Sequence, residues 1–397
     1  MLSTEEQLHI IQSGVHEIKP LDGLKKKLDK GEPLNIKLGV DPTSPDLHIG
    51  HAVPLRKLRQ FQDLGHRVTL IIGDPSGRNS TRPQLTKEQI AVNAQTYMAQ
   101  AMKILDPEKT TVRHNSEWIF SLDLAKLLSL LSNFTVARIL ERDDFNNRYT
   151  NHLPIALHEF LYPVMQAYDS VVIEADVELG GSDQLFNLLA GRELMEKLGM
   201  EPQVALTLPL LEGTDGIKKM SKSYGNYIGL TDEPADMFGK VMSIPDELMV
   251  KYFRVATAMP VSEVDAIEAG LASGELHPNK VKRQLGRELV TIYHSAQDAA
   301  AAEEAFDKLF KEHALPEDIE EFSVELVDDE EKGGVFLPPV LVACKLAGTN
   351  GEARRLIDGG GVKVNGEALA AKTYNVPAAQ LAGAVLQVGK RKFARLA

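Results

Sequence analysis

The sequence has little cysteine and no long apolar run, and both shortages exclude classes of protein. Cys344 is the single cysteine among 397 residues, which excludes an internal disulfide framework, and no cysteine and histidine cluster has zinc-site spacing. No apolar run approaches the roughly 18 residues of a membrane-spanning helix. The first ten residues, MLSTEEQLHI, are polar and acidic, unlike a secretion signal. We therefore expect a cytoplasmic protein without a bound metal.

Positive charge is scarce over most of the chain but not at its end. The formal net charge is −12, yet residues 335–397 carry nine Lys and Arg against three Asp and Glu. Such asymmetry suggests a C-terminal module that binds a polyanion, attached to an acidic remainder of the chain. The alternative is a C-terminal region whose basic charge has no function. Residues 316–331 contain nine acidic residues and no basic ones, a composition typical of a solvated linker.

An early part of the chain has the pattern of a strand, a helix and a second strand. NIKLGV (35–40) and RVTLIIG (67–73) are apolar runs suited to buried parallel strands. Between them, HAVPLRKLRQFQDLG (51–65) has apolar residues every three positions, which predicts a helix. Pro54 removes one backbone donor near its start, so we expect a kink or a late start there.

The alternation of strands and helices resumes later in the chain. SVVIEADV (170–177) and QVALTLPLL (203–211) resemble two more strands, and QLFNLLAGRELMEKLG (184–199) reads as a helix between them. This alternation predicts a doubly wound α/β domain. The expected parts are an α/β domain at 1–230 with a helical insertion at about 89–158, a helical domain at 231–315, an acidic linker at 316–334 and a compact basic module at 335–397.

The stretch DLHIGH (46–51) places two histidines around a glycine where a helix should begin. A helix start offers unpaired N–H groups and the positive end of the helix dipole, which together favour an anion. Gly50 lets a ligand approach the backbone, while His48 and His51 lie one turn apart on the same side. This arrangement suits phosphate binding, with imidazole donors for oxygens that gain charge. Structural histidines at a helix start are the alternative.

A second stretch, KKMSKS (218–223), lies in a predicted loop between Gly216 and Gly225. Such a loop supplies mobile cations and hydroxyl donors that can close over a polyphosphate. Taken alone, it could be a solvated surface loop. Both stretches, in this order and on a doubly wound sheet, make a far more specific pattern than either does.

With both motifs, the sequence resembles the class I aminoacyl-tRNA synthetases, whose signatures are HIGH and KMSKS. YPVMQAYDS (162–170) and GGSDQ (180–184) are similar to the amino-acid and ribose pocket of tyrosyl-tRNA synthetases. GEARRLIDGGGVKVNG (351–366) resembles part of an S4 RNA-binding domain. The lysine in IKLGVDPT (36–43) is similar to the residue found there in the bacterial type 2 subgroup. The resemblance implies a Rossmann-like catalytic domain with a helical insertion, a helical anticodon-binding domain that contacts tRNA, a small α+β S4 domain, and a homodimer.

The resemblance assigns a tyrosine pocket residue by residue. Tyr162 and Gln166 would hold the substrate ammonium, Asp169 would accept a hydrogen bond from the phenol, and Asp74 and Gln184 would complete the pocket. Tyr162, Gln166 and Asp169 share one face of a probable helix, so an ordinary polar face is the alternative. Their apolar neighbours favour burial, and buried polar groups need partners.

The resemblance also assigns sites for ATP and RNA. Tyrosine, ATP with Mg²⁺ and tRNA(Tyr) would be the substrates, and no prosthetic group is implied. Attack of the tyrosine carboxylate on the α-phosphorus of ATP needs positioning and charge neutralisation rather than a protein nucleophile. The implied catalytic residues are Thr43, His48, His51, Lys219 and Lys222. The implied ATP-binding residues are Gly50, Gly181, Asp183, Met220 and Lys222. The implied RNA-binding residues are Arg354, Arg355, Lys363, Lys390, Arg391 and Lys392.

Two features depart from the family pattern. Lys37 occupies a position where the family often carries a tyrosine that contacts the substrate phenol. LIIGDPSGRNSTRP (70–83) has one IGD where relatives commonly have two, so Asp74 aligns with either copy. Tyrosine–tRNA ligation is the predicted function. Two alternatives remain: a catalytically impaired paralogue that keeps RNA binding, and a tryptophan-specific enzyme.

Overall fold

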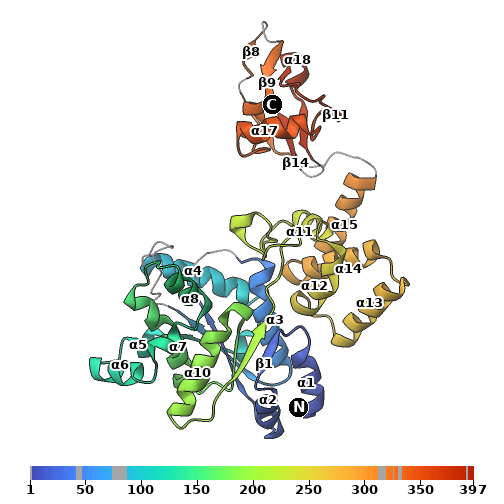
Figure 1. Ribbon diagram of the computed structural model, residues 1–397. Helices are drawn as coiled ribbons and strands as arrows, with labels where there is room; N and C mark the ends of the chain where they lie inside the picture. The colour runs from blue at the N-terminus through green and yellow to red at the C-terminus, as the bar shows by residue number, and fades with distance from the viewer. Residues whose placement is uncertain are drawn as a thin grey trace. The chain divides into compact units, whose positions relative to one another are not determined.

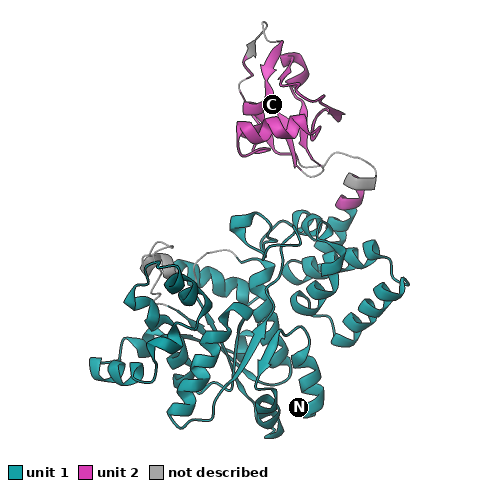
Figure 2. Ribbon diagram, in the orientation of Figure 1, with its two compact units in different colours: residues 1–304 teal, residues 305–397 magenta. Residues whose placement is uncertain are grey.

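The computed structural model describes residues 2–41, 47–73, 87–311, 319–324, 326–329, 333–389 and 392–397. Its chain divides into two compact units, residues 1–304 and 305–397 (Figure 2). The expected α/β domain and nearly all of the expected helical domain lie together in the first unit, and the expected basic module lies in the second. Among the described residues, no helix combines the length and apolar character needed to cross a membrane.

A six-stranded sheet forms the centre of the first unit, with the order β1-β6-β5-β2-β3-β4 (Figure 1). All neighbouring pairs are parallel except β1 with β6. From β2 the chain proceeds outward through β3 and β4, then returns to β5 on the other side of β2. This reversal of strand order confirms the doubly wound α/β fold and opens a crevice at the carboxyl ends of β2 and β5. The strands are β1 (Glu17–Lys19), β2 (Asn35–Val40), β3 (Arg67–Ile72), β4 (Thr110–His114), β5 (Val177–Gly181) and β6 (Val204–Leu208).

Helices accompany this sheet, and α3 (Ile49–Asp63) is the one that begins at the first motif. Its apolar residues, Leu55, Leu58 and Phe61, are fully buried. The expected late start is wrong, because α3 begins at Ile49 and continues through Pro54. The other helices of this region are α1 (Thr4–Gln12), α2 (Leu21–Asp29), α4 (Lys87–Ala101), α5 (Ser116–Ile119), α6 (Leu124–Leu131), α7 (Val136–Ile139), α8 (Asp143–Thr150), α9 (Leu161–Val172) and α10 (Leu185–Lys197). Short 3-10 helices cover Pro107–Lys109, Leu157–Phe160, Ser182–Gln184, Lys222–Tyr224 and Asp246–Leu248.

Two sequence predictions need correction. The mainly helical insertion predicted at about 89–158 does not interrupt the series of strands, because β4 lies within it and pairs with β3 at the edge of the sheet. Its sequence, TTVRH, is short and polar, so an apolar pattern could not reveal it. The predicted strand at 170–177 is also wrong, since α9 continues to Val172 and β5 starts only at Val177. A short apolar run such as VVI suits a buried helix as well as a strand.

Helices alone follow residue 231 in the first unit, as the periodicity predicts. They are α11 (Pro234–Met242), α12 (Met249–Ala256), α13 (Val261–Ser273), α14 (Pro278–Tyr293) and α15 (Ala296–Lys311), the last of which ends in the second unit. Helices α11 and α14 pack so closely that a Cβ at Gly286 would lie 2.8 Å from the Phe238 ring. Glycine at this position therefore sets the spacing of the two helices.

Besides the end of α15, the described residues of the second unit form two small sheets and three helices around their own apolar core. One sheet has the order β11 (Glu367–Ala368), β10 (Val362–Val364), β13 (Val385–Val388), β14 (Lys392–Leu396) and β7 (Glu321–Phe322). The other has the order β12 (Asn375–Val376), β9 (Gly334–Phe336) and β8 (Asp328–Asp329). The helices are α16 (Leu337–Ala343), α17 (Asn350–Asp358) and α18 (Ala378–Leu381).

The acidic segment expected as a linker at 316–334 belongs in part to this fold. Strand β7 pairs with β14, and β8 pairs with β9. The linker prediction is therefore wrong for these residues. A short strand needs only backbone hydrogen bonds at a sheet edge, so an acidic, solvated composition does not prevent pairing.

Candidate active site

A cavity of about 520 Å³ lies in the first unit, where β2, β5 and β6 end. This is the crevice between the two halves of a doubly wound sheet, where such folds bind ligands. The cavity collects most of the predicted catalytic, ATP-binding and tyrosine-binding residues. Those that line it are His48, Gly50, His51, Tyr162, Gln166, Asp169, Gly181, Asp183, Gln184, Lys219 and Met220. No group of three or more side chains suited to holding a metal ion occurs in the described part of the chain.

The two histidines of the first motif stack at the start of α3, with their ring centroids 3.7 Å apart. His51 Nδ1 accepts a hydrogen bond of 3.3 Å from the His48 backbone N–H, so the proton of a neutral His51 lies on Nε2. Burial, followed by the charges of His51 and Lys222, lowers the pKa of His48 to about 3. Burial, followed by the charge of Lys222, lowers the pKa of His51 to about 4. Both rings are therefore neutral at physiological pH and can donate without carrying charge.

The second motif lies directly against the first. The Gly50 N–H points to the Met220 sulfur at 3.4 Å, although the two residues are 170 positions apart. Ile49 donates a backbone hydrogen bond of 2.9 Å to Ile228, and Leu230 donates one of 3.0 Å to Leu47. A Cβ at position 50 would lie 3.1 Å from the His48 ring, so glycine allows this close approach.

Asn226, which the sequence analysis missed, organises the loop that carries the second motif. Its side-chain oxygen accepts from the Ser221 backbone N–H at 2.9 Å, and its amide nitrogen donates to Asp215 and to the carbonyls of Lys218 and Lys219. The signal in the sequence was the polar residue directly after Gly225, which has a φ of 67° and turns the chain. Buried Asn226 therefore gives the loop a defined shape.

The two lysines of this loop differ in position. Lys219 is exposed and lines the cavity. Lys222 is half-buried, its Nζ lies 5.9 Å from the centre of the Tyr227 ring, and its positive charge acts on both histidines. The loop thus presents cations next to the neutral imidazoles, as binding of a polyphosphate requires.

At the other end of the cavity, the Tyr162 hydroxyl donates a hydrogen bond to the Asp41 carboxylate. Burial, followed by the charge of Asp41, raises the pKa of Tyr162 well above its usual value, so the phenol stays protonated. Asp41 is not among the residues predicted from the sequence. Its signal was an acidic residue directly after β2, at the carboxyl end of a central strand.

Asp169 lies on α9 and is almost fully buried. It accepts hydrogen bonds from the Trp118 indole at 2.8 Å and from the Asn115 amide at 3.4 Å. Burial raises the pKa of Asp169 to about 6, against the lowering effect of Lys37 and of these two donors. Trp118 and Asn115 were missed because they follow β4, which the sequence analysis did not identify.

Replacing Asp169 by Asn is expected to stabilise the unliganded protein at neutral pH. The pKa of Asp169 lies above its ordinary 3.8, so its contribution to stability is complete below pH 3.8 and is lost as pH rises through about 6. Ionisation in the buried site then costs roughly 3 kcal/mol at pH 7.5. We expect thermal unfolding to show a Tm several degrees higher for Asp169→Asn at pH 7.5, with a smaller gain at pH 4.5. An equal gain at both pH values would contradict this.

Comparison with known proteins identifies the family. The family described as tRNA synthetases class I (W and Y) matches residues 29–311. The chain belongs to this family. The synthetase is 51% identical to a tyrosine–tRNA ligase of Moorella thermoacetica over 401 residues, covering 98% of this chain and 95% of the relative. It is 48% identical to a tyrosine–tRNA ligase of Geobacter sulfurreducens, covering 100% of this chain and 99% of the relative.

Solved structures agree on the fold. The synthetase resembles tyrosyl-tRNA synthetase of Archaeoglobus fulgidus, solved with L-tyrosine, with a TM-score of 0.62 and 23% identity over 75% of this chain and 99% of that one. It also resembles tryptophanyl-tRNA synthetase of Plasmodium falciparum, with a TM-score of 0.59 and 17% identity over 75% of this chain and 89% of that one. These likenesses show the class I synthetase fold.

Some predicted site residues of the synthetase fall elsewhere. Thr43, Asp74, Lys390 and Arg391 lie outside the described residues, as does most of the shortened segment that includes Asp74. Lys222 lies beside the cavity rather than in its lining. The remaining predicted RNA-binding residues, Arg354, Arg355, Lys363 and Lys392, belong to the second unit.

Proposed function

We propose that the chain is a tyrosine–tRNA ligase, which activates tyrosine with ATP to tyrosyl-adenylate and pyrophosphate and then transfers tyrosine to the 3′ end of tRNA(Tyr). The observation that carries this is the contact between Gly50 and Met220, which joins the two motifs at one end of a cavity whose other end holds Asp169. The near full-length relatives at 51% and 48% identity, both named tyrosine–tRNA ligases, support the same amino acid.

The chemistry needs positioning and charge neutralisation. The tyrosine carboxylate attacks the α-phosphorus of ATP, and pyrophosphate leaves with growing negative charge. The neutral imidazoles of His48 and His51 donate to the phosphate oxygens of ATP. In this proposal Thr43 also binds the leaving pyrophosphate, and Lys219 and Lys222 close over the phosphates. ATP brings Mg²⁺ as part of the substrate complex. Gly50, Gly181, Asp183 and Met220 form the remaining ATP contacts.

The amino acid occupies the polar end of the cavity. Tyr162 and Gln166 hold its ammonium, and Gln184 completes the pocket. Asp74, which lies outside the described residues, belongs to the same proposed pocket. Asp169 accepts from the substrate phenol. Phenylalanine would bring no donor to that buried carboxylate beyond those of Trp118 and Asn115, and tyrosyl-tRNA synthetases are a known example of rejection by this effect.

The second unit contributes tRNA binding as an S4-type module, and helices α11 to α15 form the anticodon-binding part. Arg354 lies over the rings of Phe336 and Tyr374, with its guanidinium carbon 5.4 and 6.0 Å from their centres. Clustered cations beside aromatic rings suit an RNA backbone and its bases. Because the product serves protein synthesis, a cytoplasmic location belongs to this proposal.

Pyrophosphate exchange tests the proposed activity. We expect the purified chain to incorporate labelled pyrophosphate into ATP when tyrosine is present, and not when phenylalanine or tryptophan replaces it. Exchange that depends on tryptophan would favour the tryptophan-specific alternative. Absence of exchange, together with retained tRNA binding, would favour an impaired paralogue.

The proposed enzyme is a symmetric homodimer. Apolar side chains on and beside α6 and α7 are strongly exposed, with Phe120 at 69%, Leu124 at 72%, Leu128 at 57% and Val136 at 61%. Exposed apolar side chains concentrated in one segment suit a self-complementary interface. Sedimentation at micromolar concentration should show a dimer, and Leu124→Asp/Leu128→Asp should shift it to monomer. A wild-type monomer at this concentration would refute the assembly.

A further inference from the structure

A fully buried ion pair lies behind the cavity, between Lys37 on β2 and Glu178 on β5. Their charged atoms are 2.9 Å apart and both side chains are 0% exposed. Lys37 also donates to the backbone carbonyl of Gln166 at 2.9 Å and to the Ser170 hydroxyl at 2.7 Å. A buried pair of this kind gives little net stability, because the loss of hydration offsets the attraction. Its presence points to a positional role.

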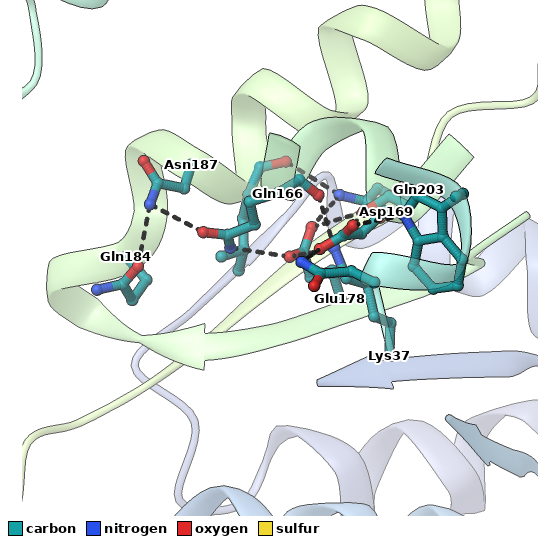
Figure 3. A network of polar contacts seen from close by, with 11 residues as sticks. Lys37, Gln166, Asp169, Glu178, Gln184, Asn187 and Gln203 are labelled. Carbon is teal, nitrogen blue, oxygen red and sulfur yellow. Dashed lines mark hydrogen bonds and ion pairs between the residues drawn. The ribbon is translucent and has the colours of Figure 1, made fainter. Parts of the chain in front are cut away.

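Glu178 is the acceptor at the centre of this network (Figure 3). Its carboxylate accepts from Lys37, from the Gln166 amide at 3.0 Å, from Ser170 at 3.1 Å and from Gln203. An ionised carboxylate cannot donate, so the Gln166 amide must turn its nitrogen toward Glu178. The oxygen of Gln166 consequently faces the opposite direction.

Asn187 on α10 carries this orientation further. Its amide nitrogen donates to the Gln166 oxygen at 2.9 Å and to the Gln184 oxygen at 3.1 Å (Figure 3). The reverse orientation would put the Asn187 oxygen against two other oxygens. In the orientation that results, the Asn187 oxygen is buried and has no hydrogen-bond partner among the described residues. The two donated bonds therefore outweigh the unsatisfied acceptor.

We propose that the Lys37–Glu178 pair sets the amide orientation of Gln166 and, through Asn187, that of Gln184. The cavity thereby presents a fixed acceptor, Gln166 Oε1, and a fixed donor, Gln184 Nε2. This inference rests on the proposed function and deepens it. An acceptor and a donor held by one relay match the ammonium and the carboxylate of a free α-amino acid. Lys37, Glu178 and Asn187 are positioning residues that act through the two glutamines.

The packing around the relay leaves little room for alternatives. A Cβ at Gly191 would lie 2.6 Å from the Gln203 amide nitrogen and 3.3 Å from a Glu178 oxygen, so the backbone of α10 closes directly over the network. Gln203 is itself fully buried and donates also to the Leu188 carbonyl at 3.1 Å. The amide groups therefore cannot be reoriented by water entering from this side.

Binding of three ligands to the full-length protein distinguishes the role of Gln166 from that of Gln184. Tyrosine has both charged groups, tyramine has only the ammonium, and 3-(4-hydroxyphenyl)propionate has only the carboxylate. All three have the phenol, so any change at Asp169 cancels when their affinities are compared as ratios. Isothermal titration calorimetry gives the dissociation constants.

The first variant is Lys37→Met/Glu178→Leu, which replaces the ion pair by apolar side chains of similar size. We expect the affinity for tyrosine and tyramine to fall roughly tenfold or more, as for loss of a hydrogen bond to a charged group. The affinity for the propionate should also fall, but less, because Gln184 still accepts the hydrogen bond from Asn187. Lys27→Met is the matched control, because Lys27 is a buried lysine paired with Asp176 at 2.8 Å outside the cavity lining. It should leave the ratios unchanged.

The second variant, Asn187→Leu, keeps the ion pair and tests the relay even if the first variant does not fold. It should weaken tyrosine and the propionate while tyramine changes little, because Gln184 loses its orientation and Gln166 keeps Glu178. A wild-type protein that binds tyrosine, with variants that weaken all three ligands equally or none of them, would overturn the relay alone. A wild-type protein that binds none of the three would overturn the proposed function as well.

Discussion

Replacing Lys222 by alanine is expected to slow tyrosyl-adenylate formation by on the order of 100- to 1,000-fold, the usual effect of removing one donor to a developing charge. The affinity for tyrosine should change little, because the polar end of the cavity is built from β2, β5 and α9. Lys222 acts on the phosphates, whose charge grows only as pyrophosphate leaves. Single-turnover formation of the adenylate, measured beside tyrosine binding, separates these effects.

Lys218→Ala is the matched control for this prediction. Lys218 belongs to the same loop and is exposed, and its Nζ lies 4.9 Å from the centre of the Tyr224 ring. Lys222, by contrast, lies close enough to both histidines for its charge to lower their pKa values. It should leave adenylate formation nearly unchanged. A parallel loss of tyrosine affinity in Lys222→Ala would count against the assignment of this lysine to the phosphates.

The sequence predicted the parts of the site that local patterns encode. The strand preceding the first motif, the helix that starts within it and the loop of the second motif all follow from apolar runs and glycines. Eleven of the predicted residues then meet in one cavity, because a doubly wound sheet brings the carboxyl ends of its central strands together.

Local patterns failed where partners are distant in sequence. Glu178 in β5 would be expected to face solvent, and its burial is explained by Lys37, 141 residues away, together with the other donors around its carboxylate. Trp118 and Asn115 reach Asp169 from a segment after β4, a strand too polar to be identified from hydrophobic periodicity. Paired burial of charge and donors from distant elements depends on tertiary packing, which one sequence does not reveal.

Deleting residues 312–397 is expected to leave tyrosine activation by ATP nearly intact while tRNA charging falls sharply. Both motifs and the whole cavity lie in the first unit, before residue 224. The cut is placed after α15, because β7 and β8 pair with strands of the second unit and a cut at 335 would leave them without partners. Pyrophosphate exchange and aminoacylation of tRNA(Tyr), measured on the same preparation, test both halves of this prediction.

The expected loss follows from charge. The region 335–397 has nine Lys and Arg against three Asp and Glu, while the rest of the chain is strongly acidic and repels a polyanion. Binding through such cations releases counterions, so the affinity of the full chain for tRNA should fall steeply with salt and that of the truncated chain much less. At physiological salt we expect the truncated chain to charge tRNA at least roughly tenfold less efficiently, mainly through a higher KM for tRNA.

A full-length variant with Arg354, Arg355, Lys363 and Lys392 replaced by glutamine separates charge from fold. All four side chains belong to the second unit, and none contributes to its apolar core. This variant should reproduce the weaker tRNA binding and the shallower salt dependence while its thermal unfolding stays close to wild type. Charging at the wild-type rate by the truncated chain would show that the second unit is not the tRNA-binding module. Loss of activation as well would show that the first unit depends on the second for its fold.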